Sequence, residues 1–202
     1  MDSTRMETFP AWSPDGKALY FCSARPVALP EKRRELRYDI LRVGFDQERG
    51  QLLEQVDTLY NSREGSLSAS FPRLSPEGKY LLYTSSDCAT FPIWHKQADM
   101  AMIDLQSMQA VDVSELNSTQ AESCHAWSSN SRWVVVGSRR LDGRFTRLYF
   151  AHFDKDGVCT KPFLLPQQNP HHNTWRLKSY NVPEFILGEV KLPIDQVKAL
   201  FE

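Results

Sequence analysis

A short stretch that reads as a β-hairpin recurs three times in this chain, and this recurrence constrains the fold more than any other feature. The copies begin at Phe9, Phe71 and Cys124, and the first two share the pattern Phe-Pro-x-x-Ser-Pro-(Asp/Glu)-Gly-Lys. Ser-Pro-Asp-Gly is typical of a type I turn, because Pro presets the second position and Gly accepts a positive φ at the end. The apolar runs after each turn are typical of strands buried on both faces.

The third copy departs from the pattern at three turn positions, which are Ser129, Asn130 and Ser131. A non-glycine residue in the left-handed conformation costs roughly 1–2 kcal/mol. We therefore expect the same hairpin in the third copy, with Asn130 in the left-handed position.

The repeat predicts an all-β fold, a β-propeller built of three four-stranded antiparallel blades. Propeller blades typically repeat at about 40–45 residues, and the copies lie farther apart than that, so we expect insertions. The predicted blades span about 1–60, 61–117 and 118–165, and an irregular C-terminal extension, 166–202, packs on them. The expected strands are 8–12, 17–23, 37–45 and 52–58, then 69–74, 79–85, 99–105 and 110–113, then 122–127, 132–139, 145–153 and 158–165.

Three blades do not close a ring, because closed propellers typically have about 4–8. The sequence therefore predicts an incomplete propeller, with apolar side chains left uncovered at one end, among them Leu81, Tyr83, Val134 and Val136. Such exposed faces mark an interface or a missing part. Three outcomes follow: the chain is the C-terminal part of a longer propeller, two copies pair, or the tail from Asn169 covers the open side. We favour the first.

The repeat resembles that of TolB-type β-propellers, a WD-like family whose repeat also occurs in the propellers of prolyl-oligopeptidase-type peptidases. Three further stretches resemble an uncharacterised group of exported bacterial TolB-like proteins. These stretches are Ser86-Asp87 with Phe91-Pro92-Ile93-Trp94-His95, then Ser138-Arg139-Arg140, and then Lys161-Pro162-Phe163-Leu164-Leu165-Pro166. A repeat of this kind identifies a fold and does not carry a function with it.

The resemblance implies a non-catalytic module of the bacterial cell envelope, periplasmic or exported, which binds another envelope protein, a peptide or another ligand. The alternative is an accessory or gating propeller of a larger hydrolase of prolyl-oligopeptidase type, whose catalytic domain lies elsewhere. No signal peptide is visible at Met1, so this chain would be an excised piece of the exported protein. A second copy or the rest of the propeller is a further expected partner.

Composition argues against a nucleic-acid ligand and against a transmembrane segment. The formal net charge is −1, whereas nucleic-acid binders gain affinity from clustered Lys and Arg. No apolar run approaches the 18 or so residues that a spanning helix needs. We therefore expect neither a nucleic-acid ligand nor a transmembrane segment.

The four cysteines are Cys22, Cys88, Cys124 and Cys159, and no two of them are closely spaced. Zinc sites in proteins normally show such close pairs. We expect free buried thiols rather than disulfides, and no bound metal.

Two loops between predicted strands have unusual content. The loop 87–96 holds Phe91, Trp94 and His95, and the loop 139–144 is rich in arginine. Because loops carry function more often than the scaffold does, we predict a binding site at one mouth of the array. Its predicted residues are Trp94, His95, His125, Arg139 and Arg140.

Each of these features also has a structural interpretation. The aromatic side chains of the first loop can cover the edge of a blade, and the arginines can pair with Asp142, Asp87 or neighbouring blades. The charged run 31–35 is interpreted as a solvated loop, with a docking patch as the alternative.

Catalytic motifs were not found. The chain has no Gly-x-Ser-x-Gly elbow, no phosphate-binding loop and no Gly-rich dinucleotide turn. His171-His172 lies in a polar, Pro-bounded stretch and lacks spaced partners for a metal. A short helix is predicted over 193–201, packed through Ile194, Val197 and Phe201. We therefore expect no enzyme activity and no cofactor.

Overall fold

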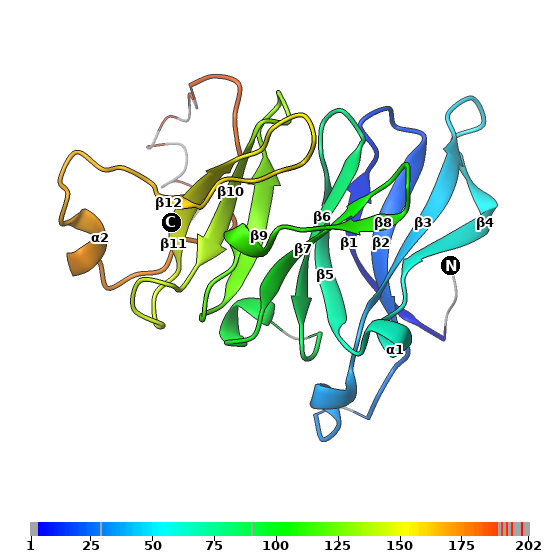
Figure 1. Ribbon diagram of the computed structural model, residues 1–202. Coiled ribbons are helices and arrows are strands. Elements are labelled where there is room, and N and C mark those ends of the chain that lie inside the picture. Colours follow the sequence, from blue (N-terminus) through cyan, green and yellow to red (C-terminus); the bar gives the residue numbers. More distant parts are fainter. Residues whose placement is uncertain are drawn as a thin grey trace.

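The structure is a computed structural model, which describes residues 4–28, 30–89 and 91–189, together with 191, 193, 195 and 199. Within this part the chain forms three four-stranded antiparallel sheets, each with its strands in sequence order. The sheets stand side by side like the blades of a fan (Figure 1). The first strand of each blade lies against the first strand of the next, β1 against β5 and β5 against β9. The predicted propeller of three blades is confirmed, and it is a partial one.

The strands lie close to their predicted positions. Blade 1 contains β1 (Met6–Trp12), β2 (Ala18–Ala24), β3 (Asp39–Asp46) and β4 (Gln51–Tyr60). Blade 2 contains β5 (Ser68–Leu74), β6 (Tyr80–Ser86), β7 (Asp99–Asp104) and β8 (Gln109–Val111). Blade 3 contains β9 (Glu122–Trp127), β10 (Trp133–Ser138), β11 (Arg147–His152) and β12 (Phe163–Leu164), the last of which is shorter than predicted. The short helices are η1 (Arg33–Glu35), α1 (Ser62–Gly65), η2 (Pro92–Trp94), η3 (Ser114–Leu116) and α2 (His172–Trp175).

Equivalent residues of the three repeats occupy equivalent places. Trp12, Leu74 and Trp127 each end the first strand of their blade. They pair with Leu19, Leu81 and Val134, which are each the second residue of the following strand. The interpretation of the repeat as three similar blades is therefore confirmed at the level of strand register.

The turn of each repeat is held by its serine. The hydroxyl oxygens of Ser13, Ser75 and Ser128 each accept a hydrogen bond from the backbone N–H five residues on, at 2.9–3.0 Å. In the third turn the left-handed residue is Ser131, with φ of 57°, and the prediction of Asn130 was wrong. The Asn130 side chain instead accepts from Ser128 Oγ and from the Arg132 N–H. The Ser131 hydroxyl accepts from the Glu77 N–H at 3.1 Å and so joins blade 3 to blade 2.

Substitutions at Ser131 separate this inter-blade bond from the backbone strain. We expect Ser131→Ala to lower the free energy of unfolding by about 1 kcal/mol, because it removes the hydrogen bond and keeps a Cβ at positive φ. Ser131→Gly loses the same bond but relieves roughly 1–2 kcal/mol of strain, so its stability should match the wild type or slightly exceed it. Urea denaturation measures both variants. Equal losses in both would contradict this account.

A bulge near the middle of each first strand was not anticipated. The register between the first two strands shifts at equivalent points in all three blades. The shift is centred on Phe9, Phe71 and Cys124, whose φ values are 53°, 52° and 55°. Bulges bend a strand and re-aim its side chains. Here the bulges bring the rings of Phe9 and Phe71 to a centroid distance of 4.3 Å between blades 1 and 2.

The core consists of two clusters, one at each junction between blades. The first joins residues of blade 1, including Tyr20 and Ile40, to Leu81 and Tyr83 of blade 2. The other face of blade 2 packs on blade 3 around Trp127. Leu81, Tyr83, Val134 and Val136 are all buried in these junctions, so the prediction that they are partly uncovered was wrong. The uncovered apolar face belongs to blade 1.

The tail after blade 3 contains α2 and otherwise lacks regular structure up to residue 189. It packs on blade 3, where the Tyr180 N–H donates to the Thr146 carbonyl at 3.0 Å. Most of the helix predicted over 193–201, with Ile194, Val197 and Phe201, lies outside the described residues. All four cysteines are free, as expected, although Cys124 is only half-buried.

Candidate functional site

An open groove of about 820 Å³ lies between two loops of neighbouring blades. One loop follows β2 and carries η1, and the other follows β6 and carries η2. Both insertions follow the second strand of their blade, so they emerge on the same side of adjacent sheets (Figure 1). The groove is lined by Arg33, Arg34, Arg37, Ser66, Asp87, Cys88, Phe91, Trp94, His95, Lys96 and Gln97.

The charge of the groove is strongly positive. Four of its lining side chains are Lys or Arg and one is Asp. Arg37 is held by backbone carbonyls, since its Nε donates to the Ser66 carbonyl oxygen at 3.1 Å. No carboxylate among the described residues pairs with Arg33, Arg34 or Lys96. Most of this positive charge therefore remains available to a ligand.

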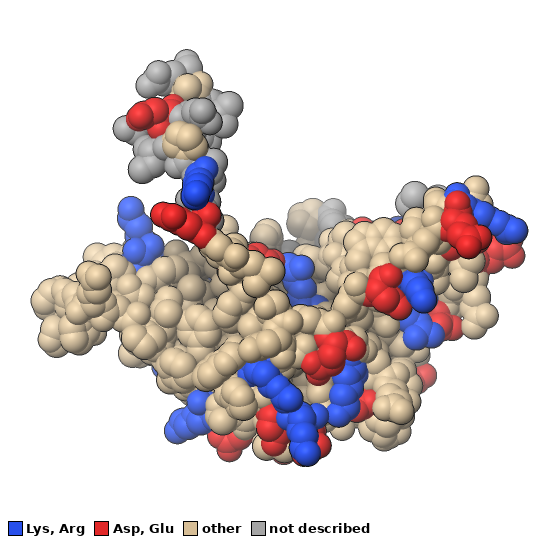
Figure 2. Space-filling view, turned by 90° about the horizontal axis from the view of Figure 1, so that it is seen from above, with Lys and Arg blue, Asp and Glu red and all other residues tan. Residues whose placement is uncertain are grey.

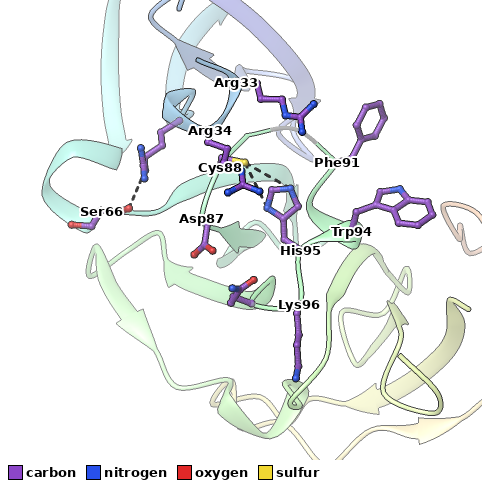
Figure 3. A pocket seen from close by; sticks show the side chains of 11 residues that line it. Arg33, Arg34, Ser66, Asp87, Cys88, Phe91, Trp94, His95 and Lys96 are labelled. Carbon is purple, nitrogen blue, oxygen red and sulfur yellow. Dashed lines mark hydrogen bonds between the residues drawn. The ribbon is translucent and has the colours of Figure 1, made fainter. Parts of the chain in front are cut away.

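Two aromatic rings form one side of the groove (Figure 3). Phe91 is 72% exposed and Trp94 is 69% exposed. Phe91 has a positive φ of 48°, and the Trp94 N–H donates to its carbonyl at 2.9 Å, which closes the turn of η2. The two rings do not fold back over the edge of the blade, so the structural alternative for this loop does not hold.

Arg139 supports Trp94 from the neighbouring blade. Its guanidinium carbon lies 4.0 Å from the centre of the Trp94 ring, a cation–π geometry. Arg139 itself is buried, and its Nε has no hydrogen-bond partner among the described residues. Burial lowers the pKa of this guanidinium. The structure therefore brings together Trp94, His95 and Arg139 of the five predicted site residues.

His95 and Cys88 lie together in the groove without the geometry of a catalytic pair. The Cys88 sulfur is 3.7 Å from both Nδ1 and Nε2 of His95 (Figure 3). The sulfur therefore lies between the two nitrogens and is in line with neither. A nucleophilic thiol needs a hydrogen bond to one ring nitrogen, so this contact does not indicate an activated cysteine.

His125 lies away from the groove, at the junction of blades 2 and 3. Its Nε2–H donates to the Leu82 carbonyl oxygen at 3.0 Å, and its Nδ1 has no partner in the described part of the chain. Burial lowers the pKa of this imidazole to about 3. The prediction that His125 lies at the mouth was wrong, because its strand turns the ring inward to the neighbouring blade.

Arg140 also lies away from the groove, and its guanidinium binds groups at the junction of blades 2 and 3. Its Nη2 donates to the Leu116 carbonyl and lies 3.2 Å from Glu122 Oε1. Its Nε donates to Ser138 Oγ at 2.9 Å. Arg140 thus holds η3 of blade 2 against blade 3, which agrees with the structural interpretation of the arginine-rich loop.

Arg147 fixes the tail rather than a ligand. It is fully buried, and its Nη2 donates to the carbonyl oxygens of Asn173 and Arg176 at 2.9 and 2.7 Å. Its closest carboxylate is that of Asp142, at 3.6 Å. The predicted group of arginines therefore separates, and Arg139 is the member that contacts a groove residue, Trp94.

Over the described ranges, no group of three or more His, Cys, Asp or Glu side chains could hold a metal ion. His171 stacks on Trp175 instead, with ring centroids 5.3 Å apart. No helix in this part of the molecule has both the length and the apolar character needed to cross a membrane. Figure 2 shows Lys and Arg interspersed with Asp and Glu on the face seen there.

The predicted site lacked the four cationic side chains of the groove, Arg33, Arg34, Arg37 and Lys96. The charged run at residues 31–35 was interpreted as a solvated loop, with a docking patch as the alternative. The signal that points to the groove is the equivalence of the two insertions. Each follows the second strand of its repeat, so the two loops must lie on the same side of neighbouring blades.

No family model matches the sequence. No curated protein matches it either.

Solved structures resemble the chain in fold. The chain matches a puromycin-hydrolysing peptidase from Mycobacterium tuberculosis at 14% identity and a TM-score of 0.56, over 82% of this chain and 24% of that one. A puromycin hydrolase matches at 16% identity and a TM-score of 0.52, over 78% and 23%. The β-propeller domain of the Trilobed protease from Pyrococcus furiosus matches at 14% identity and a TM-score of 0.47, over 82% and 44%.

The chain spans about a quarter of the length of the two hydrolases. At identities this low the likeness shows the fold alone, and the TM-score of the third match is too low to support any inference. None of the three structures is a TolB protein, so that narrower resemblance stays a prediction. The chain has the fold of a partial β-propeller, and it is similar in fold to part of two puromycin-hydrolysing enzymes.

Proposed function

We propose that this chain is a non-catalytic binding module, and that the groove between blades 1 and 2 takes an acidic segment of a protein. The proposal rests on two features of the groove. Arg33, Arg34 and Lys96 pair with no carboxylate in the described part of the chain, and the rings of Phe91 and Trp94 are exposed. Guanidinium groups bind carboxylates through paired hydrogen bonds. Exposed aromatic rings and arginines are also enriched at the centres of protein interfaces.

The groove suits a segment of chain rather than a small molecule. Its residues come from two loops that rigid blades hold apart. Binding residues often lie on loops that a rigid scaffold positions in this way. It is open to solvent and has charge along one side and rings along the other (Figure 3). An extended peptide can place acidic side chains on Arg33 and Arg34 and apolar ones on Trp94.

Charge reversal in the groove tests this proposal. We expect Arg33→Glu/Arg34→Glu to weaken binding of a fluorescein-labelled Glu- and Asp-rich peptide by roughly tenfold or more, because it replaces two attractive pairs by repulsive ones. Fluorescence anisotropy measures the affinity. Since exposed charges are screened, binding to the wild type should also weaken as salt is raised.

The matched control changes the net charge by the same amount elsewhere. Lys17 and Arg49 are exposed on turns at the opposite end of blade 1. The Lys17→Glu/Arg49→Glu variant should bind the acidic peptide nearly as well as the wild type. If both double variants lose affinity equally, binding depends on net charge and the groove has no role.

A second candidate function is that the chain forms part of the propeller of a larger peptidase. The likeness in fold to two puromycin-hydrolysing enzymes supports it. In that case the groove presents or gates peptides for a catalytic domain carried elsewhere in the protein. A Gly-x-Ser-x-Gly elbow in the reading frame beside residues 1–202 would favour this function, and its absence there would favour the independent module.

The place of the protein in the cell envelope is proposed on the TolB resemblance alone. Cell fractionation with an antibody against the chain tests it. Recovery in the cytoplasmic fraction would contradict it.

A further inference from the structure

One end of the array is an uncovered apolar face on blade 1. Within the described residues, the corresponding faces of the other two blades are each buried against a neighbouring blade. The register makes Leu19 and Phe21 of β2 equivalent to Leu81 and Tyr83 of β6. Leu19 and Phe21 instead line an open groove of about 580 Å³, whose outer wall includes Leu53, 53% exposed. Blade 1 therefore presents a junction face to which no described residue is docked.

The other end of the array is covered by the chain's own tail. Phe185 packs on Phe150 of β11 with ring centroids 5.8 Å apart. Glu184 pairs with Arg73 at 2.9 Å, and buried Arg147 holds the start of the tail. The docked tail turns other apolar side chains outward, since Ile186 is 61% exposed and Leu187 is 92% exposed.

We propose that the tail of a second copy of this chain covers the free face of blade 1. Both ends of the array are apolar, but one end is the grooved face of blade 1 and the other is the tail packed on blade 3. A contact between two different surfaces joins copies head to tail, and such contacts form a closed ring when the rotation between copies permits it. Two copies together hold six blades, within the range of about 4–8 that closed propellers have.

The charges at the two surfaces are mixed. Arg5, Glu7 and Glu54 line the blade 1 groove, and the tail carries Lys178 together with Glu184 and Glu189. Glu7, Glu54 and Lys178 have no ion-pair partner among the described residues, so Lys178 of one copy can pair with Glu7 or Glu54 of the other. The tail also already covers one blade face in its own copy, which shows that this segment packs on a propeller sheet.

Light scattering coupled to size-exclusion chromatography tests the proposal on the full chain. The wild type should have twice the mass of one chain at high concentration and dissociate on dilution. Leu53→Glu, on the blade face, and Ile186→Glu/Leu187→Glu, on the tail, should each give monomers. Leu141→Glu, at an exposed position in a loop of blade 3, is the control and should remain paired. Circular dichroism and thermal melting check that each variant is folded.

Mixing the two monomeric variants distinguishes head-to-tail pairing from pairing through like faces. The Leu53→Glu copy keeps an intact tail, and the tail variant keeps an intact blade face. The mixture therefore restores one of the two contacts and should pair, although more weakly than the wild type. A monomeric wild type, pairing that survives Leu53→Glu, or a mixture that stays monomeric would each overturn the proposal. None of these outcomes depends on the acidic-segment groove.

Discussion

Replacing Glu122 by Gln is expected to lower the free energy of unfolding by about 3–5 kcal/mol, because it breaks a buried charge pair. Glu122 is fully buried in β9. Its carboxylate accepts from the Ser118 hydroxyl at 2.7 Å and the Ser118 N–H at 3.0 Å, and from the Ser138 hydroxyl at 2.7 Å. Arg140 Nη2 donates to it at 3.2 Å. An amide cannot accept all of these bonds, and the change leaves Arg140 without its counter-ion.

Urea denaturation of a double-mutant cycle separates the pair from its surroundings. Arg140→Met removes the partner, and the double variant should lose less stability than the sum of the two single losses. Glu115→Gln is the matched control, because this exposed carboxylate lies on η3, beside Leu116, to whose carbonyl Arg140 donates. Its effect should stay within about 0.5 kcal/mol. Additive losses in the cycle would contradict a coupled pair.

The architecture was predictable because the repeat specifies turns and strands locally. Ser-Pro-(Asp/Glu)-Gly specifies the turns of the first two hairpins, and the third copy repeats in the same register. The residue at positive φ in the third turn follows from the same register. Ser131 stands where the first two copies have Gly16 and Gly78, which also have positive φ. The hydrogen bond from the Glu77 N–H to the Ser131 hydroxyl adds a contact to another blade.

The sequence predicted less well which faces of the blades are buried against a neighbour. Alternation along a strand separates two faces but does not say which neighbour covers each one. Leu81 and Leu82 are adjacent, and they pack on blade 1 and blade 3 respectively. The blade that lacks a neighbour is found only when the order of the sheets is known.

The candidate site was predicted in part for a related reason. Trp94 and His95 follow a strand, and their loop position indicated exposure. His125 lies inside a strand, where the sequence alone does not distinguish a mouth residue from a junction residue. The bulge at Cys124 shifts the register just before it, and no glycine marks that bulge. The burial of His125 therefore depends on a feature that the sequence does not signal.

That burial makes the stability of the fold sensitive to acid. An exposed imidazole in the unfolded chain has a pKa near 6.5, whereas the pKa of His125 in the folded chain is lowered to about 3. Between these values the unfolded state binds a proton that the folded state does not. The free energy of unfolding therefore falls as the pH drops from about 6.5 toward 3, by about 1.4 kcal/mol per pH unit from this group. Above pH 6.5 its contribution is constant.

His125→Gln tests this linkage. Glutamine can still donate to the Leu82 carbonyl but does not titrate, so the variant should lose about 1 kcal/mol at pH 7 through imperfect packing. Its stability should then fall less steeply in acid, and the two curves should cross between pH 6 and 4. Denaturation in urea at a series of pH values measures the difference in the free energy of unfolding between the wild type and His125→Gln. The contributions of the carboxylates cancel in this difference, because both proteins contain them. His152→Gln, on β11 of the same blade, controls for the loss of a histidine. If the slopes of wild type and His125→Gln coincide, the acid sensitivity comes from carboxylates, and the buried imidazole does not control it.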